Sequence, residues 1–436
     1  MKSDTSDLQS LDSSFPTIRL KFGVDRKTDK LDSVPDDFPI VGLDMVESWT
    51  GKLIENEEES NSLSTGLVKF TSGDVLFGKL RPYLAKGFVA DENGAASPEF
   101  LVLKPSKFNS RFLKYVVLSR NFVERVDAST FGARMPRASW EFIGSLEVPC
   151  PDLETQQTSA AFLHHHTAQI DALIEKNQRL LELLGERRFA TISRYVTHGF
   201  TSNEKIPDNR DKWVEEIPVN WDVVKFKLLT EKIGSGVTPD GGSEVYVDDG
   251  ITFIRSQNVQ FEGLDLEDVV YIDETTHAEM QATALKSQDV LLNITGASIG
   301  RCALVSSEIL PANVNQHVCI IRPSLNQLDP AFLNYVISSY IVQNQIFADQ
   351  EGASREAITF SQIGDFVIPL PPLSKQTRIS SHLDQTIEII NTVYSRVEEQ
   401  IDLLEQKRQA LITAAVTGKI DVSDWEPPAE EAEVSV

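Results

Sequence analysis

The chain contains one long segment twice. Residues 112–198 and residues 332–418 align over their whole length without a gap, 220 positions apart. The two copies share 23 identical residues in 87 aligned positions, where unrelated chains of ordinary composition share about 5. A solenoid has repeats of only about 20–50 residues. The sequence therefore predicts a duplicated module, which presents two similar surfaces to a partner that is itself two-fold or bipartite.

Composition limits the class of protein. A chain of 436 residues predicts two or three domains. No apolar run approaches the ~18 residues of a membrane span, and the polar N-terminus is not a signal peptide. Three cysteines, Cys150, Cys302 and Cys319, are too few for a disulfide framework and lack metal-ligand spacing. We therefore expect a cytoplasmic protein.

Charge is distributed unevenly. The net charge of −24 argues against a simple nucleic-acid binder. Residues 61–150, however, hold 12 basic and 8 acidic residues, whereas residues 421–436 hold six acids and no base. Since salt screens charges beyond about 10 Å, a locally basic face on an acidic chain can still bind phosphate.

Each half of the chain reads as an α+β globular domain followed by a long helix. Short apolar runs such as 74–77, 100–103, 289–292 and 317–321 are bounded by turn residues and predict strands, and residues 112–126 and 332–347 predict helix. After the prolines at 149–151 and 369–372 the pattern is helical for more than 40 residues. We expect globular domains at 1–150 and 206–372, helical regions at 151–205 and 373–424, and a disordered acidic tail at 425–436.

The two helical regions share a heptad seam, in which seam positions alternate at spacings of four and three. This pattern predicts a coiled coil. Because a globular domain separates the two copies, they can pair antiparallel, as a spacer of ~55 Å. Asn177, Arg188 and Arg408 are expected to set the register, and Gly199 and Gly418 to end the helices in a left-handed conformation. The seam residues are Ile170, Ile174, Asn177, Leu181, Leu184 and Arg188, then Ile390, Tyr394, Val397, Ile401, Leu404, Arg408 and Leu411.

Signatures of catalysis and metal binding are missing from the sequence. No phosphate-binding glycine loop, nucleophile elbow or methyltransferase tetrapeptide occurs. His164, His165 and His166 are consecutive, and successive helical residues point ~100° apart, so the three cannot close on one ion. We therefore predict no metal and no catalytic residue, and expect the histidines on a solvated face or against a partner subunit.

Polar loops at equivalent places in the two repeats are the candidate binding residues. One loop follows a strand in each repeat, and a second loop begins with Gly-Ala in each. Arginine binds both guanine and phosphate, which favours a role in DNA recognition over solvated surface turns. The candidates are Lys79, Arg81, Tyr83, Lys86, Arg134 and Arg137 in the first half of the chain, and Thr295, Ser298, Arg301 and Arg355 in the second half.

Several strings in this order resemble the specificity subunits of type I restriction-modification systems. They include Asp74-Val75-Leu76-Phe77-Gly78-Lys79-Leu80-Arg81-Pro82-Tyr83-Leu84, Ile294-Thr295-Gly296-Ala297-Ser298-Ile299-Gly300-Arg301, Ile170-Asp171-Ala172-Leu173-Ile174-Glu175-Lys176 and Asp424-Trp425-Glu426-Pro427-Pro428. The resemblance covers about residues 17–428. It departs from the family at the histidine triplet and in the acidic second domain.

The resemblance implies a non-catalytic subunit with two target-recognition domains, each reading half of a split double-stranded DNA site, on two antiparallel spacer helices. It also implies two modification (methyltransferase) subunits, which bind S-adenosylmethionine and methylate adenine, and two restriction subunits, which use ATP and Mg. The different loops at 79–86 and 293–301 predict an asymmetric target. The alternative is a coiled-coil scaffold that bridges protein partners and does not bind DNA; an enzyme with an unrecognised site is the third reading.

Overall fold

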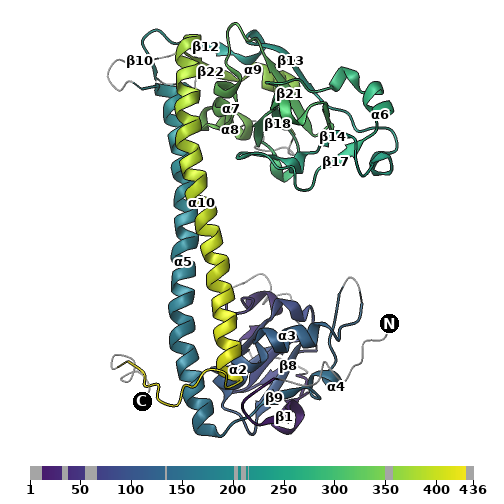
Figure 1. Cartoon of the computed structure of the whole chain (residues 1–436), viewed down its shortest axis with the longest axis vertical. Coiled ribbons are helices and arrows are strands. Elements are labelled where there is room, and N and C mark those ends of the chain that lie inside the picture. Colours follow the sequence, from purple (N-terminus) through teal and green to yellow (C-terminus); the bar gives the residue numbers. More distant parts are fainter. Residues whose placement is uncertain are drawn as a thin grey trace. The chain divides into compact units, whose positions relative to one another are not determined.

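The computed structural model describes residues 12–31, 38–54, 66–132, 135–200, 205–207, 213–214, 216–348 and 357–428 (Figure 1). The chain divides into two compact units. Unit 1 combines Met1–Gln178 with Glu399–Val436, and unit 2 is Arg179–Glu398. Each unit therefore holds one globular domain together with part of both long helices, which cross from one unit to the other.

The main sheet of each domain has four antiparallel strands in the same order. Unit 1 has the order β2-β8-β5-β6 and unit 2 the order β13-β21-β18-β19. The prediction of two similar α+β domains is confirmed. These strands are β2 (Val24–Lys27), β5 (Val75–Gly78), β6 (Gly87–Val89) and β8 (Phe100–Pro105), and β13 (Thr230–Ser235), β18 (Val290–Asn293), β19 (Cys302–Leu304) and β21 (Val318–Pro323).

A three-stranded sheet differs between the domains. Both contain a parallel pair, β3 (Ile40–Val41) with β7 (Gly94–Ala96), and β14 (Ile251–Ile254) with β20 (Ala312–Val314). The third strand lies on opposite edges: β4 (Val68–Phe70) pairs with β7, whereas β17 (Val270–Ile272) pairs with β14. The duplicated frame therefore carries different surroundings in its two copies.

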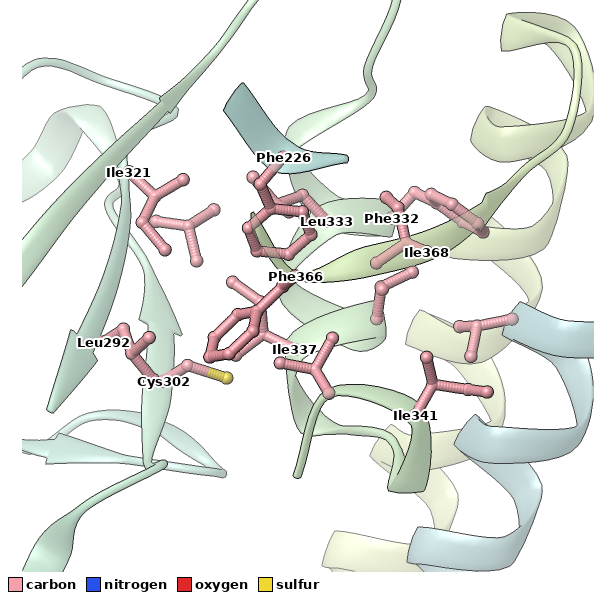
Figure 2. Packing of buried hydrophobic residues seen from close by; sticks show 14 of the residues in the cluster. Phe226, Leu292, Cys302, Ile321, Phe332, Leu333, Ile337, Ile341, Phe366 and Ile368 are labelled. Atoms are coloured by element: carbon pink, nitrogen blue, oxygen red, sulfur yellow. The ribbon is translucent and has the colours of Figure 1, made fainter. Parts of the chain in front are cut away.

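Two short helices cover the main sheet in each domain. These are α2 (Ser110–Val117) and α3 (Arg120–Asp127), and α7 (Pro330–Ser338) and α8 (Tyr340–Ala348). The Asn109 and Asp329 side chains cap α2 and α7 by accepting from the backbone N–H groups of Phe112 and Phe332. In unit 2, α7 and α8 lie between the sheet and the long helices (Figure 1). Figure 2 shows Leu333 and Ile337 of α7 facing the strand residues Leu292 and Ile321.

The first and last strands of each domain pair with one another. β1 (Thr17–Arg19) is antiparallel to β9 (Glu147–Pro149), and β12 (Asp222–Lys225) is antiparallel to β22 (Val367–Leu370). The long helices α5 (Leu153–His198) and α10 (Leu373–Val416) begin a few residues after β9 and β22. The pairing of its first and last strands therefore completes each domain immediately before its long helix begins.

The long helices end as the sequence predicts. Gly199 follows α5 with φ +61°, and Gly418 lies beyond α10 with φ +72°, so both adopt the left-handed conformation that favours glycine. A Cβ at Gly418 would lie 2.9 Å from the Phe15 ring, and one at Gly199 would lie 3.0 Å from Trp221. Within the described ranges, all helices lack the continuous apolar stretch that a bilayer span requires.

Within each unit the helices pack antiparallel. In unit 2, Ile192 and Val196 near the end of α5 share a core with Ile379 and Leu383 near the start of α10. In unit 1, the start of α5 and the end of α10 share a core in the same way. On α5, the seam residues from Ile174 to Arg188 are half-buried between exposed neighbours. On α10, Ile390, Val397 and Arg408 are buried, whereas Tyr394 is exposed and lines a cleft.

A buried glutamine joins each helix to its own domain. The Gln156 amide accepts from the Asn109 N–H at 2.7 Å and donates to the carbonyls of Lys107 and Pro151. Gln376 repeats this set on Asp329, Gln327 and Pro371. Both glutamines are fully buried. The repeated Pro-x-Pro-x-Leu-x-x-Gln string is therefore the joint between domain and helix.

The seam arginines bond to the globular domains. Arg408 pairs with Asp171 of α5 at 2.7 Å, as expected for the helix pair, and also donates to the Trp49 carbonyl at 2.9 Å. Arg188 donates to the Phe261 carbonyl and to Glu262 at 3.1 Å. Arg188 is expected to set the register of the helix pair, but the hydrogen bonds of its guanidinium go to a hairpin of the second domain. At the repeat position of Asp171, α10 has Asn391, which offers no carboxylate.

The glutamine joint yields a stability prediction. Replacing Gln156 by leucine removes three buried hydrogen bonds and leaves one backbone N–H and two backbone carbonyl groups without these partners. The free energy of unfolding should therefore fall by about 2–4 kcal/mol. The exposed neighbour Gln157, changed to leucine, should shift it by less than about 0.5 kcal/mol. Denaturant unfolding of the three proteins compares them. Equal midpoints for Gln156→Leu and Gln157→Leu would show that the joint is dispensable.

Candidate nucleic-acid interface

The structure brings the two candidate loops of the first domain together. The 79–86 loop follows β5, and Arg81 and Ala85 within it adopt left-handed φ values of 48° and 46°. The Arg81 N–H donates to the Pro136 carbonyl at 2.8 Å, and the Ala138 N–H donates to the Lys79 carbonyl at 3.0 Å. Loops more than 50 positions apart in sequence therefore form one surface at the end of the main sheet.

The side chains of this surface differ in their exposure and in the hydrogen bonds they already make. Arg81 and Tyr83 are exposed, and Lys79 is half-buried. Lys86 is largely covered and donates to the Leu43 carbonyl at 2.8 Å, with Asp44 at 3.9 Å, so it braces a neighbouring turn. Arg81 and Tyr83 are therefore the residues best placed to meet a ligand.

Arg137 is held by a carboxylate at the edge of the same surface. It makes a forked contact with Glu99, at 3.1 and 2.9 Å, and is half exposed. The hydrogen bond and the charge of Glu99 raise the pKa of Arg137, so the side chain stays cationic. Arg134 lies outside the described residues, and its role stays a prediction.

The second domain repeats this arrangement. The 294–301 loop follows β18, and the Ile358 N–H donates to the Ile294 carbonyl at 3.0 Å, beside a bridge between Thr295 and Ala357. Ser298 is half-buried. Arg301 donates to the Gln260 side chain at 2.6 Å, so it ties its own loop to a hairpin. Arg355 lies outside the described residues and remains a prediction.

A series of hydrogen-bonded polar side chains occupies the second surface, and sequence reasoning missed it. His317 Nδ1 lies 2.7 Å from the Thr295 hydroxyl, and its Nε2 lies 3.1 Å from the Gln316 amide nitrogen. The Thr238 hydroxyl donates to the Gln316 amide oxygen. An amide N–H that donates to Nε2 leaves the ring proton on Nδ1, which can then donate to Thr295. Gln316 is exposed and lies between Thr238 and His317 in this hydrogen-bonded series.

His317 takes the place that Glu99 has in the first domain. The Lys79 N–H donates to the Glu99 carbonyl at 2.9 Å, and the Ile294 N–H donates to the His317 carbonyl at 3.0 Å. The same backbone position therefore carries a carboxylate paired with arginine in one domain and an imidazole bonded to hydroxyl and amide groups in the other. Neutral residues give no charge signal in a sequence, and only the structural equivalence reveals them.

Two residues of the histidine triplet, His165 and His166, face the C-terminal segment. Trp425 lies against Phe162, His165 and His166, with ring centroids 5.7, 5.9 and 6.3 Å away. Burial and the neighbouring cations lower the pKa of His166. The segment expected to be a free tail thus begins with a packed tryptophan, and residues 429–436 lie outside the described part. Among the described residues, no cluster of three or more His, Cys, Asp or Glu could hold a metal ion.

The loop surfaces can bind DNA through two kinds of contact. The guanidinium of an exposed arginine can bind phosphate or guanine, and the hydroxyl of an exposed tyrosine can bind phosphate. The side-chain amide of glutamine matches the paired hydrogen-bond donor and acceptor of adenine. The three cysteines are free, and burial raises the pKa of both Cys302 and Cys319 to about 12, so neither thiol is a ready nucleophile.

Known proteins share this chain's sequence and fold. A family model described as the type I restriction modification DNA specificity domain matches residues 37–183 and 218–402, more than half of the chain. The specificity subunit of the type I restriction enzyme EcoBI from Escherichia coli is 22% identical over 436 residues, covering 92% of this chain and 90% of that protein. The MjaVIII specificity subunit from Methanocaldococcus jannaschii is 23% identical over 300 residues, covering 68% and 67%.

A solved structure has the same fold. A chain from work on complex assembly and conformational transition of the type I R-M system superposes with a TM-score of 0.64 at 18% identity, covering 94% of this chain and 99% of that one. Together with the doubled domain and the antiparallel helices, the match of the family model settles the classification: this chain belongs to the family of type I restriction-modification DNA specificity proteins.

Proposed function

We propose that the chain reads an asymmetric, bipartite site on double-stranded DNA, with one half-site for each globular domain. The observation that carries this proposal is the paired loop surface, which recurs at the same place in both domains with different side chains. Equivalent frames explain why two half-sites are read, and the exchange of Glu99 for His317 explains why they differ.

The two domains use different contacts in this proposal. The first meets DNA with Arg81, Tyr83 and Arg137, which suit phosphates and guanine. The second meets it with Gln316, Thr295 and Ser298, where the exposed Gln316 amide can pair with adenine N6 and N7. The first half-site therefore depends more on charge, and the second on hydrogen bonding.

Partner subunits perform the chemistry in this proposal. The outward faces of the long helices expose apolar residues at repeat-related positions: Leu173 and Leu183 of α5 recur as Val393 and Leu403 of α10. Such residues at helical spacing suit packing against partner helices. Because the pattern occurs twice, it fits two methyltransferase subunits, which bind S-adenosylmethionine. Two restriction subunits, which use ATP and Mg, join them, and the assembly methylates adenine and cuts unmodified DNA.

Methylome sequencing tests the function directly. A host that carries this chain and its methyltransferase should acquire methylated adenines in one bipartite motif with two different half-sites. The matched control carries the methyltransferase alone and should lack that motif. A palindromic motif would contradict the asymmetry of the two domains, and the absence of any motif despite a stable complex would favour the scaffold alternative.

Salt dependence separates the two half-sites. Arg81→Ala should weaken binding by the assembled complex on all sequences and lower the slope of log K against log salt by about 1. Gln316→Ala should leave that slope unchanged and relax the choice of one base by about 1–3 kcal/mol. Lys104→Ala, an exposed lysine at the far end of β8, is the control and should change neither. Identical salt slopes for Arg81→Ala and Lys104→Ala would remove Arg81 from the interface.

A further inference from the structure

We infer that Arg188 and Arg408 are positioning residues for DNA reading: each holds the recognition loop of one domain in place on the helix that arrives from the other repeat. This inference rests on the proposed function and deepens it. It assigns to two residues of the helix pair an effect on how strictly the distance between half-sites is read.

In unit 1, two hydrogen bonds lead from α10 to the recognition loop. Arg408 donates to the Trp49 carbonyl at 2.9 Å, and the Trp49 N–H donates to the Ala85 carbonyl at 3.1 Å. Ala85 belongs to the 79–86 loop. Trp49 has a left-handed φ of 67°, a conformation that costs a bulky residue energy and persists only where its surroundings enforce it. Bonds at both of its backbone polar groups provide that enforcement.

In unit 2, an equivalent path leads from α5 to the second recognition loop. Arg188 donates to the Phe261 carbonyl, in the turn between β15 (Val259–Gln260) and β16 (Gly263–Leu264). Arg301, the last residue of the 294–301 loop, donates to Gln260 of the same hairpin. Arg188 and Arg408 occupy the same position of the repeat. The device is therefore duplicated, although its intermediate residues differ.

The two joints of each domain bind different helices. Gln156 attaches the first domain to α5, the helix that follows this domain in the sequence. Arg408 attaches the same domain to α10, the helix that follows the second domain. Gln376 and Arg188 do the same for the second domain. The returning helix also packs in the core of its unit, through Ile412 and Val416 of α10 in unit 1 and through Ile192 and Val196 of α5 in unit 2. The arginine adds an attachment at the level of the recognition loop, which fixes the orientation of that loop. Loss of the arginine should therefore loosen orientation and leave the fold of the domain intact.

The two anchors are unequally enclosed. The Arg408 and Asp171 side chains are 6% and 13% exposed, whereas Arg188 is 15% exposed and its partner Glu262 is 65% exposed. Within the described residues, the Nε of Arg188 is buried without a hydrogen-bond partner. Arg188 also lines a cleft of 820 Å³ with Asn391 and Tyr394. Loss of Arg188 is therefore the change that the fold tolerates more easily, and it is the better first test.

The experiment uses the complete complex with its methyltransferase and the target found by methylome sequencing. Duplexes keep both half-sites and change the spacer by one base pair in either direction. For Arg188→Met, the preference for the native spacer should drop by about tenfold, with half-site specificity kept. Arg188→Lys, which keeps a donor, should recover part of it. The control Arg187→Met, at the exposed neighbouring position, should match wild type.

A double-mutant cycle checks the path. If Arg188 acts through the hairpin on the loop, the effects of Arg188→Met and Arg301→Met on spacer preference should be strongly non-additive. For unit 1, Arg408→Met is combined with Asp171→Asn, because loss of the arginine alone would leave the Asp171 carboxylate buried without its counter-charge. Lys407→Met, at an exposed position, is the control.

The outcomes separate cleanly. A flattened spacer preference with non-additive coupling supports the inference. An unchanged preference, or a uniform loss of affinity on every spacer, overturns it and leaves the arginines a structural role alone. A wild-type complex that binds every duplex alike overturns the proposed function itself.

Discussion

Each globular domain is bound to two helices that belong to different repeats, and the rest of the architecture depends on that double attachment. Gln156 and Gln376 bind the outgoing helices through buried amides, and Arg408 and Arg188 bind the returning ones. Burial makes the two glutamine contacts and the Arg408 contacts costly to lose, because an unpaired amide or guanidinium in the core is destabilising, whereas Arg188 lies beside a cleft. Within each unit, these joints attach one domain to both of the long helices.

The two copies have diverged in linked pairs of residues. In unit 1, Lys114 lies near Arg408, and burial together with repulsion from that arginine lowers the Lys114 pKa to about 8. Asp171 offsets this crowded positive charge. In unit 2, the equivalents of Lys114 and Asp171 are Asn334 and Asn391, so both the extra cation and its counter-charge are absent. The exchange of Glu99 for His317 follows the same logic at the loops, and allows one frame to carry two chemistries.

The sequence predicted the frame better than the contacts. The repeat, the α+β pattern and Gly199 and Gly418 foretold the two domains, the long helices and their ends, because periodicity and backbone freedom are local properties. The role of Arg188 could not be foreseen, since its partner lies 73 residues away in a hairpin that no pattern places beside the helix. Lys86 looked like a ligand-binding base and instead braces a turn, and Gln316 and His317 carried no charge signal. Local sequence shows which residues are polar, and only the fold shows which of them are already satisfied.

Changing the length of the helix pair is the sharpest test of whether the shared helices set the spacing between half-sites. Inserting four residues near Glu186, with four more at the facing turn of α10, adds about one helical turn, or ~6 Å, without touching either domain. At 3.4 Å per base pair this is about two base pairs. The methylome of a host carrying the lengthened chain should show the same two half-sites separated by a longer spacer. An active variant that methylates the original motif with its original spacer would contradict the claim that the shared helices set how the two domains read DNA.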